Sequence, residues 1–331
     1  MRKYLLILLW LPLFGQVPDT NTFSFTDVKD EIENNGGATT NSLVDAFTNA
    51  NDAGFDPAYE GSKNALLNFR NYTHLGGLRF SGKSFNFTGT IDQGRGIYFK
   101  SDGTQMYLGN SDAAPRGIYS FNLSTAWDVS SASYASQSYS VYEVNSFTIK
   151  PDGTKMYILA YTSGVGLTIR QYTLSTAWNM STASYDSVQF IVQGSIIRQG
   201  GIYIDASGTR MYVTDPTNVV RQYTLSSAWN LSTASLTSTL NVSGQLNVAS
   251  GIYFKPDGTK MYITDSFDED IYQYTLSTAW NISTATYDSL FYDFGVDAYD
   301  IYIKSEGENF FIITLEEARE YITDFPWSIE D

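Results

Sequence analysis

The sequence predicts an all-β protein whose main part is a five-bladed β-propeller, and three observations carry this prediction. A long phrase recurs along the chain, and its best copy reads GIYFKPDGTKMYITD over 251–265 and IYQYTLSTAWNISTATYDS over 271–289. Each copy divides into four short strand-like runs, which is the content of one propeller blade. An additional strand-like run precedes the first copy, and the last copy lacks its fourth run.

The spacing of the copies is regular. Their turn glycines, Gly103, Gly153, Gly208, Gly258 and Gly307, lie 50, 55, 50 and 49 residues apart. Four short strands separated by turns fill a period of this length, whereas a helical repeat would show apolar residues at a spacing of three to four. The 25 tyrosines and 20 phenylalanines also favour pleated surfaces, on which flat side chains pack well.

In the best copy the four strands are predicted over 251–255, 260–264, 271–276 and 286–294. A Pro-Asp-Gly-Thr sequence joins the first two strands. Proline at the second position of a tight turn and glycine near its end both suit a β-turn. A variable loop follows the second strand, and STAWNISTA bridges the third strand to the fourth.

The two ends of the repeat predict how the ring closes. Residues 84–99 align without a gap with 239–254, so that Phe85 takes the place of Leu240 in the fourth strand of a blade. No blade precedes this segment, while the last copy, over 300–327, has no fourth strand. We expect the early strand to complete the last blade, which would cover the exposed sheet edges. An open solenoid, or a strand swapped into a neighbouring chain, is the alternative.

The chain before the repeat divides into two further segments. Residues 1–16 combine two basic residues with an apolar run of the length found in signal peptides, too short to span a bilayer. A strand or an assembly contact is the alternative for this run. Residues 17–76 contain short amphipathic patterns and predict a small helical module, whose marginal core needs the propeller or a partner. The propeller is predicted over 78–331, and the mature chain has no stable membrane span.

Composition excludes several classes of function. The formal net charge of −15 argues against a nucleic-acid partner, because phosphate binding needs clustered lysine and arginine. No cysteine is present, which rules out disulfides, thiol catalysis and a cysteine zinc site. The single histidine, His74, excludes most histidine-based catalysis. This acidic, cysteine-free composition fits a secreted or surface-exposed protein, or one that handles cations.

The repeat helps to distinguish structural residues from ligand-binding residues. A residue found in every copy is expected to serve the packing that every blade requires. The tryptophans of the STAWN phrase recur in this way, at positions 127, 178, 229, 280 and 327. We interpret them as wedges between adjacent blades, in preference to platforms that stack on sugars. The recurrent Asp-Gly-Thr segments lack the alternating acidic ligands of a calcium loop and are interpreted as turns.

We expect ligand binding at the positions where the sequences of the copies differ. The loops between second and third strands differ strongly, as do the segments leading into the first strands, such as 92–96 and 194–201. In a propeller both sets lie on one face, around the mouth of the central channel, and loops on a rigid frame carry binding. The candidate contacts to glycans or partner proteins are Arg116, Tyr161, Arg198 and Asp215.

One of these loops, over 265–270, is strongly acidic. Asp265, Asp268 and Asp270 supply hard oxygen ligands of the kind that bind Ca²⁺, which makes calcium the one candidate cofactor. A solvated acidic loop without a metal is the competing interpretation.

Two sequence phrases resemble known families. FKPDGTKMY, followed by YTLSTAWNISTATY, resembles a repeat of virion structural and tail-associated proteins of marine bacteriophages, strongly over 96–290. FDPAYEGSKNALLNFRNY, over 55–72, is similar to a module of predicted structural proteins of phages that infect Bacteroidota. The resemblance implies a role on a virion surface, with assembly partners bound through 17–76. The turn phrase is also similar to that of extracellular propellers, including lactonase-like ones.

Two main hypotheses for function follow. The first is a non-catalytic propeller on a virion or cell exterior that binds glycans or partner proteins through its variable loops. The second is an extracellular hydrolase or lactonase with carboxylates at the channel mouth, drawn from Asp92, Asp215, Asp265 and Asp297. A hydrolase needs convergent acids with different pKa values, and no phrase marks such a set. The first hypothesis, with no catalytic residue, is therefore favoured; a regulatory scaffold inside the cell is a third.

Overall fold

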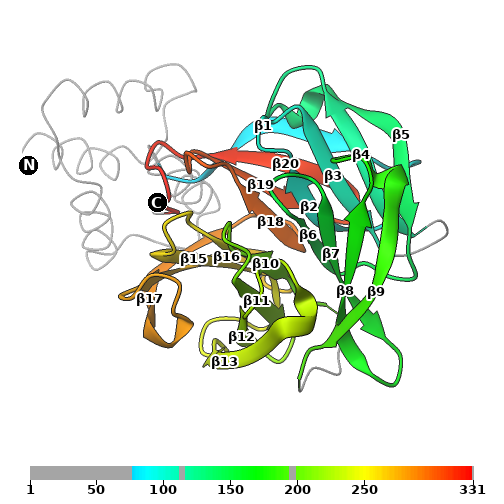
Figure 1. The fold of residues 1–331 in the computed structure, drawn as a ribbon. Helices are drawn as coiled ribbons and strands as arrows, with labels where there is room; N and C mark the ends of the chain where they lie inside the picture. Colours follow the sequence, from blue (N-terminus) through cyan, green and yellow to red (C-terminus); the bar gives the residue numbers. More distant parts are fainter. Residues whose placement is uncertain (1–76, 112–115, 194–198, 330–331) are drawn as a thin grey trace, which may run out of the picture. The chain divides into compact units, whose positions relative to one another are not determined.

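The computed structural model describes residues 77–111, 116–193 and 199–329. These residues form five four-stranded sheets arranged around a centre (Figure 1), which confirms the predicted all-β, five-bladed propeller. All of them belong to one compact unit, Gly76–Asp331. The predicted signal-peptide-like segment and helical module lie outside the described residues. Within the described ranges, no helix has the length and apolar character needed to cross a membrane.

In each of the first four blades, the strands lie side by side in chain order. The first blade consists of β2 (Gly94–Phe99), β3 (Gln105–Asn110), β4 (Gly117–Leu123) and β5 (Ala132–Ser140). The second consists of β6 (Ser146–Ile149), β7 (Lys155–Thr162), β8 (Gly166–Leu174) and β9 (Ala183–Ile191). The third consists of β10 (Ile202–Ile204), β11 (Arg210–Asp215), β12 (Val219–Leu225) and β13 (Ala234–Asn241). The fourth consists of β14 (Ala249–Phe254), β15 (Lys260–Asp265), β16 (Asp270–Leu276) and β17 (Ala285–Asp293).

The fifth blade is built from two distant parts of the chain. It consists of β18 (Asp300–Ile303), β19 (Asn309–Ile313), β20 (Glu317–Ile322) and β1 (Arg79–Asn86). β1 is antiparallel to β20, with Phe85 opposite Ala318 (Figure 1, cyan beside red). The innermost strands β2, β6, β10, β14 and β18 contact one another in a cycle, so the first and fifth blades are neighbours.

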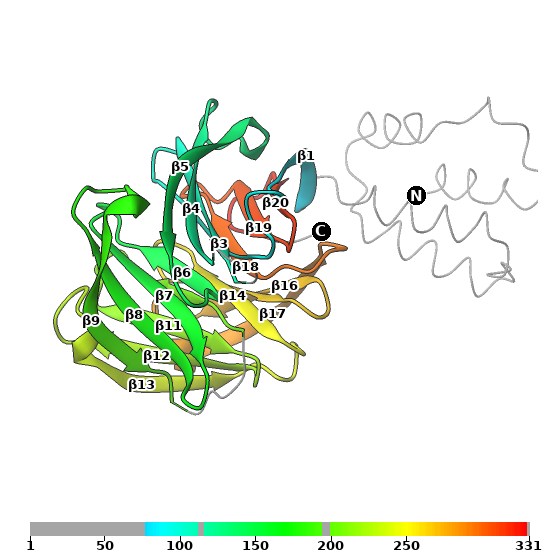
Figure 2. The same cartoon turned by 90° about the vertical axis from the view of Figure 1, so that its right-hand side faces the viewer.

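Burial follows the position of each strand in its blade. β15 is buried almost throughout, because both of its faces pack against adjacent blades. Met261 joins the core between the third and fourth blades, and Tyr262 joins the core on the other side. The outer strands β9 and β17 instead alternate roughly between partly buried and exposed residues, as strands with one solvated face do. Figure 2 shows β9 and β13 at the outer edge of their blades.

The recurring tryptophans seal the blades at their turns, in agreement with the sequence interpretation. Gly258 has a φ of +74°, and a Cβ there would lie 2.4 Å from the Trp280 indole, so both the backbone and the packing require glycine. The Trp280 amide donates to the Gly258 carbonyl oxygen at 2.9 Å. Its ring lies 6.5 Å from that of Tyr212 in the preceding blade.

Candidate functional site

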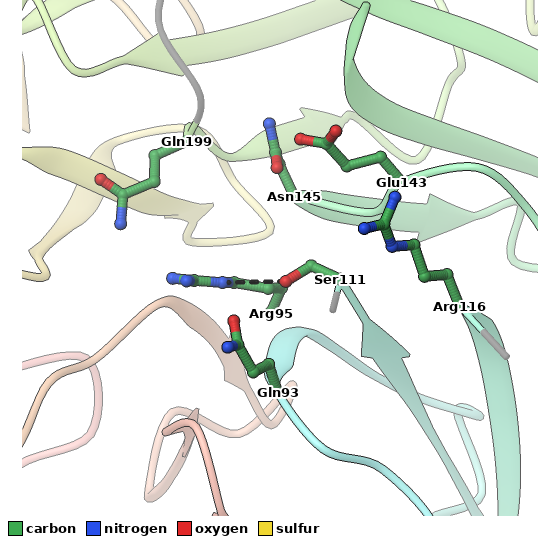
Figure 3. Close-up of a pocket in the computed structure, with 7 residues that line it drawn as sticks. All are labelled: Gln93, Arg95, Ser111, Arg116, Glu143, Asn145 and Gln199. Carbon is green, nitrogen blue, oxygen red and sulfur yellow. Dashed lines mark hydrogen bonds between the residues drawn. The ribbon is translucent and has the colours of Figure 1, made fainter. Parts of the chain in front are cut away.

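A small pocket lies on the variable-loop face, where the segments leading into the first strands of the first three blades meet. Its cavity volume is about 120 Å³. All of its lining side chains are polar, and five of them come from the ends of inner strands or the segments beside them. The lining residues are Gln93, Arg95, Ser111, Arg116, Glu143, Asn145 and Gln199 (Figure 3).

Arg95, in β2, is held by contacts on two sides. Its guanidinium carbon lies 3.9 Å from the centre of the Tyr299 ring, which belongs to the fifth blade. Its Nε donates to Ser111 Oγ at 3.2 Å (Figure 3). Its Nη1 is buried and has no hydrogen-bond acceptor among the described residues. The guanidinium is therefore fixed in orientation and keeps one donor unused.

Asn145 lies directly before β6 and is 7% exposed. Its backbone amide donates to the Leu159 carbonyl oxygen at 2.8 Å, which anchors this residue to its own blade. The side-chain Nδ2 is buried and, within the described ranges, has no acceptor. Buried polar groups in folded proteins are nearly always paired, so these two donors stand out among the residues that line the pocket.

The rim of the pocket carries an arginine, an exposed aromatic ring and an acid. Arg116 Nη1 donates to the Tyr142 carbonyl oxygen at 2.9 Å, and its guanidinium carbon lies 5.5 Å from the centre of the Tyr142 ring. The Tyr142 side chain is 64% exposed, and the next residue, Glu143, is buried. The pocket thus has two arginines and one acid, although the whole chain carries a charge of −15.

Asp300 lies one residue deeper along the inner strands and is almost fully buried. It occupies the position of Gly251 in the fourth copy and of Ser146 in the second. Its Oδ2 accepts from Ser146 Oγ at 2.8 Å and from the Ile97 amide at 3.4 Å, and its Oδ1 accepts from its neighbour's amide. Burial raises the pKa of this carboxyl to about 8, although these hydrogen bonds oppose the rise.

Four tyrosines fill the centre two residues further along the same strands. Neighbouring rings lie 5.3 to 5.4 Å apart, centre to centre, and meet edge to face, which is a favoured aromatic geometry. Burial raises the pKa of each phenol. They are Tyr98, Tyr203, Tyr253 and Tyr302. The polar pocket and Asp300 therefore lie on one side of an aromatic plug.

The structure places the predicted contact residues in different surroundings. Arg116 lines the pocket. Tyr161, at the end of β7, packs against the core between the second and third blades and is not a lining residue. Asp215 is fully buried, accepts from the Thr217 amide at 2.8 Å and forms an ion pair with Arg221, so its role is structural. Arg198 lies outside the described residues.

The acidic loop gives the calcium prediction no support. The Asp265 carboxylate accepts hydrogen bonds from four backbone amides, at 2.5 to 3.1 Å, and is saturated by them. Asp268 Oδ2 accepts from Asn247 Nδ2 at 2.6 Å. Asp270 accepts from the Tyr272 hydroxyl at 3.0 Å, and burial raises its pKa to about 6. The described part of the chain contains no group of three acidic or histidine side chains that could hold a metal ion.

The carboxylates proposed for a hydrolase are not gathered at the pocket either. Asp92 and Asp297 are not lining residues, and Asp297 accepts from the Tyr299 hydroxyl at 2.8 Å. The acid that lines the pocket is Glu143, and Asp300 is buried one residue deeper; the sequence analysis predicted a role for neither. The sequence does contain a feature that distinguishes Asp300, because the other copies carry glycine or serine at this position.

Comparison with known proteins adds little to this geometry. No family model and no curated protein matches the sequence. Among solved structures, a functionally unknown protein from Desulfotomaculum acetoxidans is 14% identical over 67% of this chain, with a TM-score of 0.45. The periplasmic gluconolactonase PpgL of Pseudomonas aeruginosa is 13% identical over 68%, with a TM-score of 0.45. The chain spans 65% and 64% of the lengths of these two proteins. The β-propeller domain of Cps50 (Swd1) from Myceliophteria thermophila is 9% identical over 74% of this chain and 99% of its own length, with a TM-score of 0.43.

Proposed function

We propose that this protein is a non-catalytic binding propeller that recognises glycans through the pocket on its variable-loop face. The observation that carries the proposal is the wholly polar lining of one cavity on the variable-loop face, with two arginines, three amides, a hydroxyl and one acid.

The chemistry of the lining favours a saccharide over a protein partner. Its amides, hydroxyl and arginines offer donors and acceptors to sugar hydroxyls, and no lining side chain is apolar. A protein partner would instead need an apolar anchor in the centre of its interface. The volume is well below the roughly 300–1,000 Å³ of pockets that enclose a drug-sized ligand, so it suits one terminal group. The exposed ring of Tyr142 offers an apolar face for the adjoining sugar.

A hydrolase with its active site at the channel mouth is the second candidate, and one observation favours it. Asp300, with its raised pKa, and Glu143 form a pair of carboxyl groups in different environments, as acid and base pairs do. Against this, both oxygens of Asp300 already accept hydrogen bonds. A glycosidase also places both carboxyl groups beside the bond to be cleaved, and the pocket lining contains only Glu143.

We place the protein on a virion or cell exterior, on the resemblance of its repeat to tail-associated phage proteins. Residues 1–16 would direct export, and 17–76 would bind assembly partners. We also propose that β1 is the strand that closes the ring, which its pairing with β20 supports. Weakening β1 should then destabilise all five blades together.

A glycan array with the full-length protein, in the presence and absence of Ca²⁺, tests the main proposal. We expect binding without turnover. Arg116→Ala should weaken binding without lowering the melting temperature, whereas Arg170→Ala, on β8 and outside the pocket, should change neither. Hydrolysis of a glycoside or lactone would establish the enzyme instead. Absence of binding to every glycan would refute the glycan proposal.

A further inference from the structure

We propose that Asp300 is a positioning residue for the pocket, and that the charge state of its carboxyl changes the placement of the pocket side chains. Such a residue touches no ligand and acts through the groups that line the site. This control goes beyond the proposed function, because it concerns the shape of the pocket whatever ligand occupies it. Its basis is the place of Asp300 among the inner strands and the set of neighbours that it binds.

The Asp300 carboxyl connects the inner strands of several blades. A Cβ on Gly251, in the fourth blade, would lie 2.8 Å from Asp300 Oδ1, so only glycine leaves room for the carboxyl there. Oδ2 accepts from Ser146 Oγ, in the second blade, at 2.8 Å and from the Ile97 amide, in the first, at 3.4 Å. The Ser146 hydroxyl also accepts from the Ile202 amide of the third blade, at 3.4 Å. The Asp300–Ser146 pair therefore touches all five blades.

The pocket side chains are attached closely to this pair. Asn145, a lining residue, directly precedes the serine of the pair, and Arg95 lies two residues before Ile97. Tyr299, whose ring lies 3.9 Å from the Arg95 guanidinium carbon, directly precedes the aspartate. Close-packed interiors transmit strain, so a change in the pair should reach both Arg95 and Asn145.

The charge of the pair depends on pH. Burial raises the pKa of the Asp300 carboxyl to about 8, so the carboxyl is neutral in mildly acidic solution and charged in alkaline solution. Among the described residues, no lysine or arginine forms an ion pair with it. A buried charge without a partner is costly, and entry of water or separation of the packed groups relieves that cost. Ionisation should therefore loosen the inner strands around the pair.

The other groups around Asp300 keep their charge state while its carboxyl titrates. On β2 the guanidinium of Arg95 stays charged, because arginine does not lose its proton in proteins. Strands β6 and β19 contribute no titratable side chain. Burial raises the pKa of each surrounding phenol above the ordinary value of 10.0. These phenols belong to Tyr98, Tyr203, Tyr253, Tyr299 and Tyr302.

Nuclear magnetic resonance of the full-length ¹⁵N-labelled protein, titrated without ligand from about pH 6 to about pH 9.5, tests the proposal. The Ile97 amide reports on Asp300 directly, because it donates to the carboxyl. The Arg95 Nε–H and the Asn145 side-chain amide report on the pocket, and their signals are identified by their loss in Arg95→Lys and Asn145→Ala. We expect all three signals to shift with one midpoint near pH 8.

Variants trace the path from the carboxyl to the pocket. Asp300→Asn keeps the shape of the side chain without its charge, so it should hold the pocket signals at their low-pH positions and remove the shift. Ser146→Ala removes the hydroxyl that leads to the second blade, so Asn145 should lose most of its shift while Arg95 keeps its own. Asp270→Asn removes another carboxyl whose pKa burial raises, to about 6, and should leave all three shifts unchanged.

The outcomes separate this role from the proposed function. A shift at Ile97 without one at Arg95 or Asn145 would show that the carboxyl titrates without positioning the pocket, and would overturn the proposal. Absence of a shift at all three would overturn it as well. The wild-type titration alone gives both results if a variant fails to fold, which its melting temperature reveals. Because no ligand is present, failure of the glycan array would leave the positioning role intact, and the reverse also holds.

Discussion

Four of the five junctions between blades share a contact that the fifth lacks. At each of the four, a tyrosine hydroxyl from the second strand of one blade donates to a tryptophan carbonyl oxygen in the next, at 2.5 to 3.1 Å. The pairs are Tyr107 with Trp178, Tyr157 with Trp229, Tyr212 with Trp280, and Tyr262 with Trp327. At the junction between the fifth and first blades, Phe311 replaces the tyrosine and only stacks on Trp127.

A second contact changes at the same junction. Gln171, Gln222 and Gln273 each accept a hydrogen bond from a backbone amide of the following blade. In the fifth blade Glu320 takes this position, and its partners lie within its own blade, Ser81 and Lys83 on β1 and Asn309 on β19. Lys83 Nζ also lies 3.3 Å from Asp128 Oδ2 in the first blade.

The difference shows how a repeat protein joins its ends. The regular junctions use residues that recur in several copies, the tyrosine in the first four and the glutamine in the second to fourth, so duplication of a copy duplicates the contact. The junction between last and first copies uses β1, a strand from outside the complete copies, whose Lys83 forms ion pairs with Glu320 and Asp128. We therefore expect the stability of this junction to depend on β1.

The largest expected effect comes from β1 and the residue that follows it. Phe87 is 2% exposed and packs in the core with Phe311 and Ile313. Phe87→Ala should reduce the free energy of unfolding by about 3–5 kcal/mol, because it leaves a cavity at the junction. Phe80→Ala, on β1 itself but 44% exposed, should cost less than about 1 kcal/mol. Urea unfolding of the full chain measures both, and similar small costs would mean that the ring does not depend on β1.

Asp300 makes the same junction sensitive to pH. The folded state raises its pKa from 3.8 to about 8, so between those values the unfolded chain has lost a proton that the folded chain keeps. The free energy of unfolding should therefore fall as pH rises from about 4 to about 8, and level off above. Between pH 5 and pH 8 we expect a fall of roughly 3–4 kcal/mol from this group.

Asp300→Asn should remove that fall, and the difference between the two proteins isolates it from other groups such as Asp270. Asp92→Asn, which changes an exposed carboxyl, is the matched control. Melting temperatures at pH 5, 6.5 and 8 provide the comparison. A pH-independent difference between wild type and Asp300→Asn would show that the carboxyl titrates normally and is not desolvated.

The sequence predicted the blades well because it presents one pattern several times. The strand expected over 271–276 is β16 (Asp270–Leu276), and the one expected over 260–264 is β15 (Lys260–Asp265). Turn residues, tryptophans and apolar runs recur in each copy, so chance features of one copy average out.

The candidate site was less predictable for a physical reason. Arg116 was found because it lies in a loop that varies between copies, but that criterion does not say which side chains face a common space. Asp215 also borders such a loop, but its carboxylate forms an ion pair with Arg221 within the same blade. Arg95 and Asn145 become a site only through contacts across blades, and an unused donor is visible only after every other bond has been assigned.

The smallest expected effects come from two substitutions that exchange tyrosine and phenylalanine between a regular junction and the fifth junction. They test the comparison of the junctions most directly. Tyr262→Phe removes the hydroxyl that donates to Trp327 at a regular junction and should cost about 1 kcal/mol. Phe311→Tyr adds a hydroxyl at the fifth junction, where the carbonyl oxygen of Trp127 is the equivalent acceptor, and should gain a similar amount. Urea unfolding of both variants and of the double variant measures the exchange. A loss of stability in Phe311→Tyr would mean that β1 has shaped the fifth junction so that the shared contact no longer fits there.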